Sequence, residues 1–319
     1  MTPAPSSSTP RRPGGGIRDG ASGNAPGEHG GRDRGVEGAV SGGGAWARDA
    51  ASHAGLSRPL PAEAEASFVI VTESHDLDVS TEWGEHSHPA HELVWVRRGT
   101  MTSRVGHQVF TVSSGYGLWI PAGVPHSGRL TAGVELCDAF FAPERTPADA
   151  AVQVSGGRAT VVVLSPVLES LLLYLADPLL ERGARARAEA VVFDVLAPSE
   201  RDLAVTVPED ALVQPLVDAL LADPADRRSL EQWAGELGLS ERTVTRAFRA
   251  STGLSFAQWR QSVRVHSAIA SLAEGAEVGE VAASLGYAQA GTFIGAFRRV
   301  MGVTPGVFRA AAATGSALS

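Results

Sequence analysis

SLEQWAGELGLSERTVTRAFR (residues 229–249) and EVGEVAASLGYAQAGTFIGAFRR (residues 277–299) repeat one pattern: a short amphipathic segment, a Leu-Gly turn and a second segment ending in arginine. In the first segment of each copy, apolar residues recur at the i, i+3, i+4 and i+7 spacing of a buried helix face. They are Leu230, Trp233, Ala234 and Leu237, then Val278, Val281, Ala282 and Leu285. A Gly-containing turn between two short helices lets the second helix project into a DNA major groove. The stretch therefore predicts two helix-turn-helix units in tandem.

Helix-capping signals support these boundaries. Ser229 and Ser255 are each followed three residues later by glutamine, which predicts capping boxes, and Thr304 precedes a proline at a first helical position. Between the two units, the apolar residues from Phe256 to Ala273 predict one long connecting helix. Its roughly 18 residues would span about 27 Å, close to the roughly 34 Å between successive major-groove faces on one side of B-DNA. One copy of the chain can therefore contact two adjacent groove segments.

The second segment of the first unit has one apolar and one basic face. Val244, Ala247 and Phe248 are expected to face inward, which leaves an outer face made of Arg242, Thr245, Arg246 and Arg249. A helical bundle without a DNA role is the simpler alternative, because amphipathic helices are common. It requires turn glycines, caps and outward arginines to coincide by chance.

These motifs resemble the AraC/XylS family of transcriptional regulators, from "LGLSERTVTRAFRASTGLSFAQWRQSVRVHSAIASLAEG" to the closing "LGYAQAGTFIGAFRRVMGVTPGVFR". The resemblance implies a seven-helix domain that binds specific DNA sequences near promoters, with RNA polymerase and a second copy of the chain as partners. It also implies that Arg242, Thr245 and Arg246 contact base edges.

The second unit departs from the family pattern. Its corresponding positions hold Ala290, Gly291 and Gly295, which cannot hydrogen-bond a base, and no polar cap precedes its second helix. Phosphate contacts position a protein on DNA, whereas base contacts specify the sequence. We therefore expect phosphate contacts from this unit and from the end of the first recognition helix; the residues are Arg249, Thr292, Arg298 and Arg299.

The excess of acidic residues lies before the predicted helix-turn-helix region. The formal net charge of the 319 residues is −8, with 27 basic residues, all arginine, and 35 acidic residues. From Leu212 onward there are ten arginines and nine acidic residues, which gives +1 there and −9 before it. Binding must therefore rely on arginines placed on one face. A lone cysteine, Cys137, and no visible signal peptide or membrane span favour a cytoplasmic protein without membrane contact.

The predicted fold is α+β and multidomain. Residues 1–62, rich in Gly, Ser, Pro and Arg, are expected to be a disordered tail. Short strands with Gly and Pro turns predict a cupin-like β-barrel over 63–160. Residues 161–208 are expected to be a helical dimerisation segment and linker, 209–312 an all-α double helix-turn-helix domain, and 313–319 a disordered C-terminus.

A second constellation of polar residues lies in the strand-rich region. His86-x-His88-x3-Glu92-x6-Gly99 is followed by Gly115-x5-Pro121-x-Gly123-x2-His126, and the pair resembles the two cupin motifs, with Leu130 where the second usually has Asn. Because residues i and i+2 of a strand share a face, His86 and His88 are expected to point into one cavity, joined there by Glu92 and His126. Three imidazoles and a carboxylate can hold a divalent metal. The alternative is that the four residues line a pocket for an organic effector.

The sequence thus predicts a DNA-binding transcriptional regulator, an activator by family resemblance, that responds to a small molecule bound in its cupin-like domain. It is not expected to be an enzyme. The rival interpretation is a metal-dependent cupin dioxygenase or isomerase that uses its C-terminal helices as a DNA tether. A nucleoid-type architectural protein, which would bind without sequence preference, is a third.

Overall fold

The computed structural model describes residues 69–200 and 203–313. The tail expected to be disordered, residues 1–62, lies outside the described residues, and so does 314–319 of the expected C-terminal tail. Among the described residues no helix is both long and apolar enough to cross a membrane.

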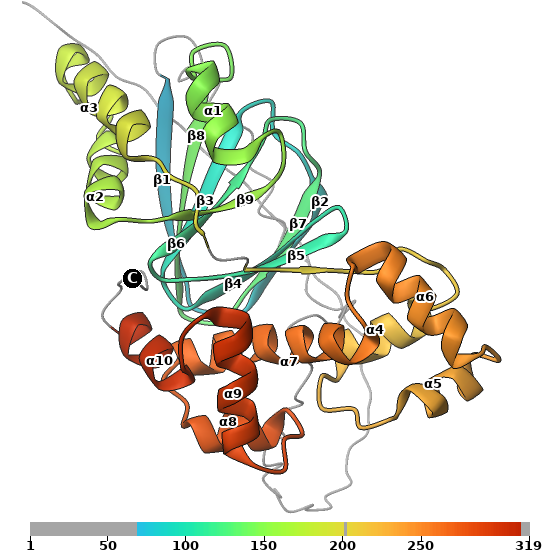
Figure 1. Ribbon diagram of the computed structural model, residues 1–319. Coiled ribbons are helices and arrows are strands. Elements are labelled where there is room, and N and C mark those ends of the chain that lie inside the picture. The colour runs from blue at the N-terminus through green and yellow to red at the C-terminus, as the bar shows by residue number, and fades with distance from the viewer. Residues whose placement is uncertain (1–68, 201–202, 314–319) are drawn as a thin grey trace, which may run out of the picture. The chain divides into compact units, whose positions relative to one another are not determined.

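Two antiparallel sheets form the N-terminal part of the structure (Figure 1). The first has the strand order β1-β8-β3-β6-β9 and the second β10-β5-β4-β7-β2. Their strands are β1 (Ile70–Leu77), β2 (Thr81–His86), β3 (His91–Arg98), β4 (Thr100–Val105), β5 (Gln108–Ser113), β6 (Tyr116–Ile120), β7 (His126–Leu130), β8 (Val134–Phe141), β9 (Thr160–Val163) and β10 (Ala204–Thr206). The expected cupin-like β-architecture is therefore confirmed. β10 is a difference, because it lies in the segment expected to be a linker and pairs with β5.

Side-chain alternation along the first sheet separates two apolar clusters. Val94 of β3 and Leu118 of β6 belong to the cluster on the inner face, whereas Trp95 and Trp119 lie on the outer face, packed with Leu168 of the helices that cover it. Both tryptophans are fully buried in the outer core, since adjacent residues of a strand point to opposite faces.

Three helices lie between β8 and β10 in the chain: α1 (Ala148–Ser155), which precedes β9, and α2 (Pro166–Leu175) and α3 (Arg182–Val195), which follow it. The segment of residues 161–208, expected to be helical, contains α2 and α3, whereas α1 has no counterpart in the sequence-based prediction. α2 and α3 cover the outer face of the first sheet, as Figure 1 shows beside β1.

A buried polar pair on α3 attaches that helix to the edge strand β1. The guanidinium of Arg185 donates to the carbonyls of Ile70 (3.3 Å), Leu175 (2.9 Å) and Asp177 (2.8 Å). One turn later, Glu189 accepts from the backbone N–H groups of Val69 and Ile70. These bonds satisfy backbone groups at a sheet edge and at the C-terminal end of α2 that burial would otherwise leave without partners.

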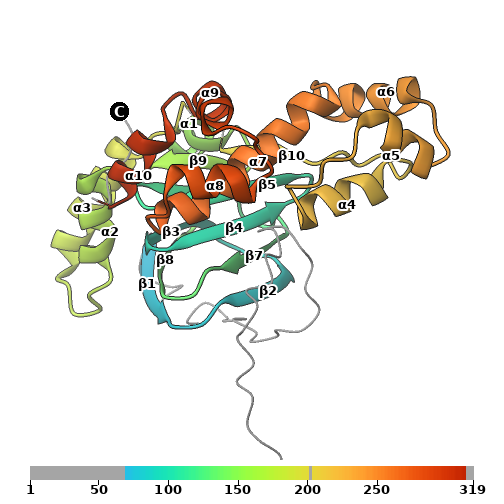
Figure 2. The ribbon, with the colours of Figure 1, turned by 90° about the horizontal axis from the view of Figure 1, so that it is seen from below.

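The C-terminal part is helical as expected: α4 (Gln214–Ala222), α5 (Leu230–Glu236), α6 (Glu241–Thr252), α7 (Phe256–Ala273), α8 (Val278–Ser284), α9 (Ala290–Met301) and α10 (Pro305–Ala313). Both predicted capping boxes, at Ser229 and Ser255, are formed, and the Thr304 hydroxyl accepts from the third helical residue of α10. α7 is the 18-residue connecting helix. Figures 1 and 2 both show α5 and α6 towards one end of α7 and α8, α9 and α10 towards the other.

Candidate functional site

The first recognition helix, α6, separates its faces as the sequence predicts. Val244 and Phe248 are fully buried, whereas Arg242, Arg246 and Arg249 are exposed on the opposite face. Thr245 is only half-buried and borders this basic face. The Ser240 hydroxyl accepts from the backbone N–H of Thr243 and so fixes the first turn of α6. The α6 arginines therefore form an accessible cationic surface on a well-capped helix.

The second recognition helix, α9, presents a different surface. No side chain caps its N-terminus at Gln289, in agreement with the sequence. Thr292, Arg298 and Arg299 are exposed, and Arg299 donates to the side chain of Gln261 on α7. Sequence reasoning missed Ile294, whose exposed fraction is 37%. An apolar side chain on a recognition helix suits contact with a thymine methyl group.

Three histidines meet between the two sheets. His86 ends β2, His88 lies in the loop after it, and His126 begins β7; their ligand atoms all lie within 4.8 Å of one another. The expected cluster is therefore formed, but the strand-face argument for it is only half right, since His88 lies beyond the last residue of β2. Its Nε2 nevertheless reaches to 3.1 Å from Nε2 of His86.

Backbone carbonyls orient two of these imidazoles. Nδ1 of His86 lies 3.0 Å from the carbonyl of Gly84, and Nδ1 of His126 lies 3.1 Å from the carbonyl of Val124. A hydrogen on each Nδ1 leaves Nε2 as the free ligand atom, which is the arrangement that holds metal-binding histidines in place. The 3.1 Å between Nε2 of His86 and of His88 is near the roughly 3.3 Å that two nitrogens about 2.0–2.1 Å from a tetrahedral zinc would have. The three residues can hold a metal.

Glu92 of β3 lies beside the three histidines. Its Oε2 lies 3.1 Å from Nε2 of His126 and 3.7 Å from Nε2 of His88, and its side chain is 8% exposed. Burial lowers the pKa of His126, but the hydrogen bond and the charge of Glu92 outweigh that effect, and the net pKa is raised. Burial lowers the pKa of His88 despite Glu92. The imidazole of His126 therefore takes up a proton more readily than an ordinary histidine, and the imidazole of His88 less readily.

Sequence reasoning missed two further acids beside this cluster. Asp138 of β8 pairs in register with Glu73 of β1 and with Val94 of β3, so its side chain shares the inner face with Val94. Burial raises the pKa of Asp138 well above its usual value, and the charges of Glu92 and Glu73 raise it further. Leu136, two residues before Asp138 on β8, is buried on the same inner face, and this alternation could have revealed Asp138, because a charged residue at an inward strand position is unusual.

Three other residues have structural roles or lie at the surface. His91 is half-buried: its ring stacks on Trp119 and its Nδ1 accepts from the backbone N–H of Ala122. His107 is exposed. Cys137 is a buried thiol, and burial raises its pKa to about 12, which suits a structural role.

Comparison with known proteins agrees with both halves of this arrangement. Residues 233–311 match a family model described as a helix-turn-helix domain, and residues 75–136 match one described as a cupin domain. The chain is 34% identical over 229 residues to the HTH-type transcriptional regulator NimR of Escherichia coli strain K12, an alignment that covers 69% of this chain and 80% of NimR. It is 38% identical over 102 residues to the HTH-type transcriptional regulator RipA of Corynebacterium glutamicum, covering 32% of this chain and 31% of RipA. The ToxT structure from Vibrio cholerae aligns over 76% of this chain and 98% of its own, with a TM-score of 0.32 and 10% identity.

Proposed function

Because the chain belongs to the AraC family of helix-turn-helix transcriptional regulators, we propose that it recognises a specific operator with α6 and positions itself on the adjacent groove segment with α9. The observation that carries the proposal is the exposed triad Arg242, Arg246 and Arg249 on one face of α6, opposite a fully buried apolar face. Arginine forms bidentate hydrogen bonds with guanine in the major groove. The relatives are transcriptional regulators, not enzymes, so the cupin domain is assigned to sensing and not to catalysis.

Footprinting tests this proposal directly. The purified protein is expected to protect two adjacent major-groove segments about 34 Å apart in DNA upstream of its own gene. Protection of every sequence to the same extent would instead indicate the architectural alternative. The activating mode, with contact to RNA polymerase, rests on the family resemblance, and a promoter fused to a reporter gene tests it.

Arg298 is expected to contact phosphate and not a base. It is exposed on the last turn of α9, so its charge is accessible to DNA. Arg298→Ala should weaken binding to all operator variants by the same factor and reduce the slope of log K against log salt by about one. Fluorescence anisotropy at several salt concentrations measures both quantities. A loss confined to one base pair would assign Arg298 to base recognition instead.

The sensing part of the proposal assigns a divalent transition metal, for which zinc is the probe, to His86, His88 and His126, with Glu92 beside them. A metal there would leave an open position for an organic effector. Effector binding would then favour one arrangement of the two DNA-binding domains of a dimer, which requires different affinities of the effector for the two arrangements. A pocket that binds an organic effector without metal is the alternative.

Zinc affinity is expected to fall as the solution becomes more acidic. Only neutral imidazole binds metal, and the raised pKa of His126 means that protons already compete near neutral pH. The apparent affinity should therefore fall by about tenfold per pH unit for each proton displaced. Competition with a chromophoric chelator at pH 8 and pH 6 measures the change. His88→Ala should remove the site, whereas His107→Ala, which alters an exposed histidine away from the cluster, should keep it; equal binding by both variants would disprove the assignment.

The segment formed by α2 and α3 is proposed to be the dimer interface. Val167 and Tyr174 lie two turns apart on α2 and are 56% and 48% exposed, and Leu179, in the connection to α3, is 90% exposed. Exposed apolar side chains in one region favour a protein contact. Val167→Glu combined with Tyr174→Glu should raise the dissociation constant of the dimer by about tenfold or more. Analytical ultracentrifugation measures it, with Val79→Glu, an exposed apolar residue elsewhere, as the control that should not dissociate the dimer.

A further inference from the structure

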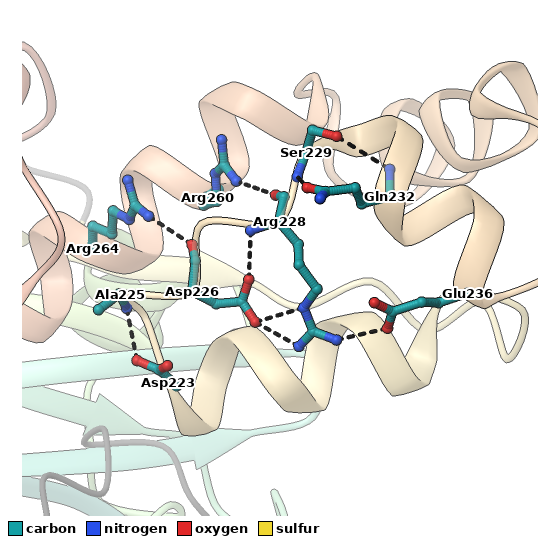
Figure 3. Close-up of polar contacts among 9 residues, drawn as sticks. All are labelled: Asp223, Ala225, Asp226, Arg228, Ser229, Gln232, Glu236, Arg260 and Arg264. Carbon is teal, nitrogen blue, oxygen red and sulfur yellow. Dashed lines mark hydrogen bonds and ion pairs between the residues drawn. The ribbon is translucent and has the colours of Figure 1, made fainter.

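Residues 223–228, in the loop between α4 and α5, contact the connecting helix α7 and helix α5 of the first helix-turn-helix unit (Figure 3). Two arginines of α7 donate to its backbone. Arg264 donates from Nε to the carbonyl of Pro224 (2.7 Å) and from Nη2 to that of Asp226 (2.8 Å), and Arg260 donates to the carbonyl of Arg228 (2.8 Å). The connecting helix α7 therefore holds this loop through three hydrogen bonds from arginine side chains. Hydrogen bonds with a charged donor are stronger than those between neutral groups.

The same loop is fixed to the first unit. Arg228 donates to the carboxylate of Asp226 within the loop and to Glu236 of α5 (2.6 Å), and its guanidinium lies 3.5 Å from the centre of the Trp233 ring. Figure 3 shows the Asp226–Arg228–Glu236 chain extending from the loop to α5. Trp233 is buried in the core of the first unit, so these contacts attach the loop to α5 and to that core.

The loop also touches the turn of the second unit. Gly286, between α8 and α9, has φ +79°, and a Cβ built there would lie 2.9 Å from the carbonyl oxygen of Ala225. The guanidinium of Arg264 lies 5.6 Å from the centre of the neighbouring Tyr287 ring. The turn glycine of the first unit differs: Gly238 has φ +64°, but a Cβ there would meet nothing within 4 Å. Only the second turn is packed against backbone.

Two units joined by a single helix can tilt relative to each other by bending at its ends. A second contact away from the helix axis removes that freedom. We propose that the loop of residues 223–228, held by Arg264 and contacted by Gly286, fixes the orientation of α9 relative to α6 and thereby the spacing of half-sites that the protein accepts. Arg264 is in this account a positioning residue, since it contacts protein and not DNA. The inference rests on the proposal that both α6 and α9 contact DNA.

Gly286→Ala and Gly238→Ala form a matched pair to test it. Both place a side chain at positive φ and carry that strain, but only the alanine at position 286 pushes against Ala225. Full-length protein is titrated with its footprinted operator and with versions in which one base pair is inserted or deleted between the two half-sites. The wild type should lose about tenfold to a hundredfold in affinity on the altered spacings, because α9 then loses its contacts.

Gly286→Ala should bind the native operator more weakly than the wild type does. Its loss of affinity on the altered spacings, here called the spacing penalty, should be about threefold or less. Its binding to DNA that carries only the α6 half-site should stay at the wild-type level. Gly238→Ala should keep the wild-type penalty. Arg264→Gln, which replaces the long charged donor by a shorter neutral amide, should behave as Gly286→Ala does, and Arg264→Lys, which keeps a long charged donor, should restore part of the penalty.

An unchanged spacing penalty in Gly286→Ala, or an equal change in Gly238→Ala, would overturn the inference. If Arg264→Gln does not fold, the glycine pair still decides. A wild-type footprint of one groove segment only would refute the proposal that both helices contact DNA, and that outcome is visible before any variant is compared.

Discussion

Arg185→Met is expected to destabilise the protein by about 3 kcal/mol, because it removes a charged donor and leaves buried carbonyls without partners. The side chain of Arg185 is buried, and its guanidinium bonds three carbonyls from β1, the end of α2 and the loop after it. Methionine keeps most of the apolar volume, so the loss reports the hydrogen bonds and not a cavity. Urea denaturation, followed by the fluorescence of the buried Trp95 and Trp119 on the same sheet, measures the free energy of unfolding.

Arg187→Met provides the matched control, since Arg187 lies on the same helix but is exposed. Its substitution should change the free energy of unfolding by no more than about 0.5 kcal/mol. Glu189→Gln should fall between the two, because its side-chain oxygen can still accept from Val69 and Ile70 but loses the charge that strengthens those bonds. Equal stability of Arg185→Met and Arg187→Met would show that the hydrogen bonds of Arg185 do not contribute to the free energy of unfolding.

The helical half of the chain was predictable in detail because its signals are local. A capping box spans three residues and a turn glycine one, so Ser229, Ser255 and Gly238 mark helix ends without reference to the rest of the fold. The amphipathic period alone separates Val244 and Phe248 from the arginines of α6. These local signals do not identify what α6 binds. The exposure of Arg242 and Arg246 is compatible with the base contacts proposed for them.

The strands were harder to predict because their partners are distant. β2 and β7 carry polar residues at most positions and pair with each other only by a register that shifts between Trp83 and His86. Neither segment has the apolar alternation that identifies a strand. β10 is three residues long and gains its hydrogen bonds from β5, far back in the chain. Local patterns cannot supply such pairings.

The candidate sensing site was predictable in its residues but not in its surroundings. Histidine spacing identified His86, His88 and His126, yet the acids opposite them come from strands that the motif does not include. Asp138 faces the cluster only because β8 lies between β1 and β3 in the sheet order. Its raised pKa favours a neutral carboxylic acid, which can donate a hydrogen bond to a ligand.

Arg246→Ala is expected to change the sequence preference of the protein and not merely its affinity. The guanidinium of Arg246 is exposed on the second turn of α6, between Arg242 and Arg249. If it forms a bidentate contact with a guanine, its removal should cost about 1–3 kcal/mol at that base pair, which is about 5-fold to 150-fold in affinity. The other three bases at that position should then bind almost equally well to the variant, because none of them gained from the contact in the wild type.

Competition binding with operators mutated one base pair at a time distinguishes this outcome from simple loss of charge. Arg249→Ala is the matched control: Arg249 lies three residues later, is exposed like Arg246, and is proposed to contact phosphate. It should weaken every operator by the same factor and leave the ranking of the bases unchanged. An equal loss on every operator for Arg246→Ala would place Arg246 on the phosphate backbone. Specificity would then have to come from Arg242 and Thr245, with any contribution of α9 limited to its exposed Thr292 and Ile294.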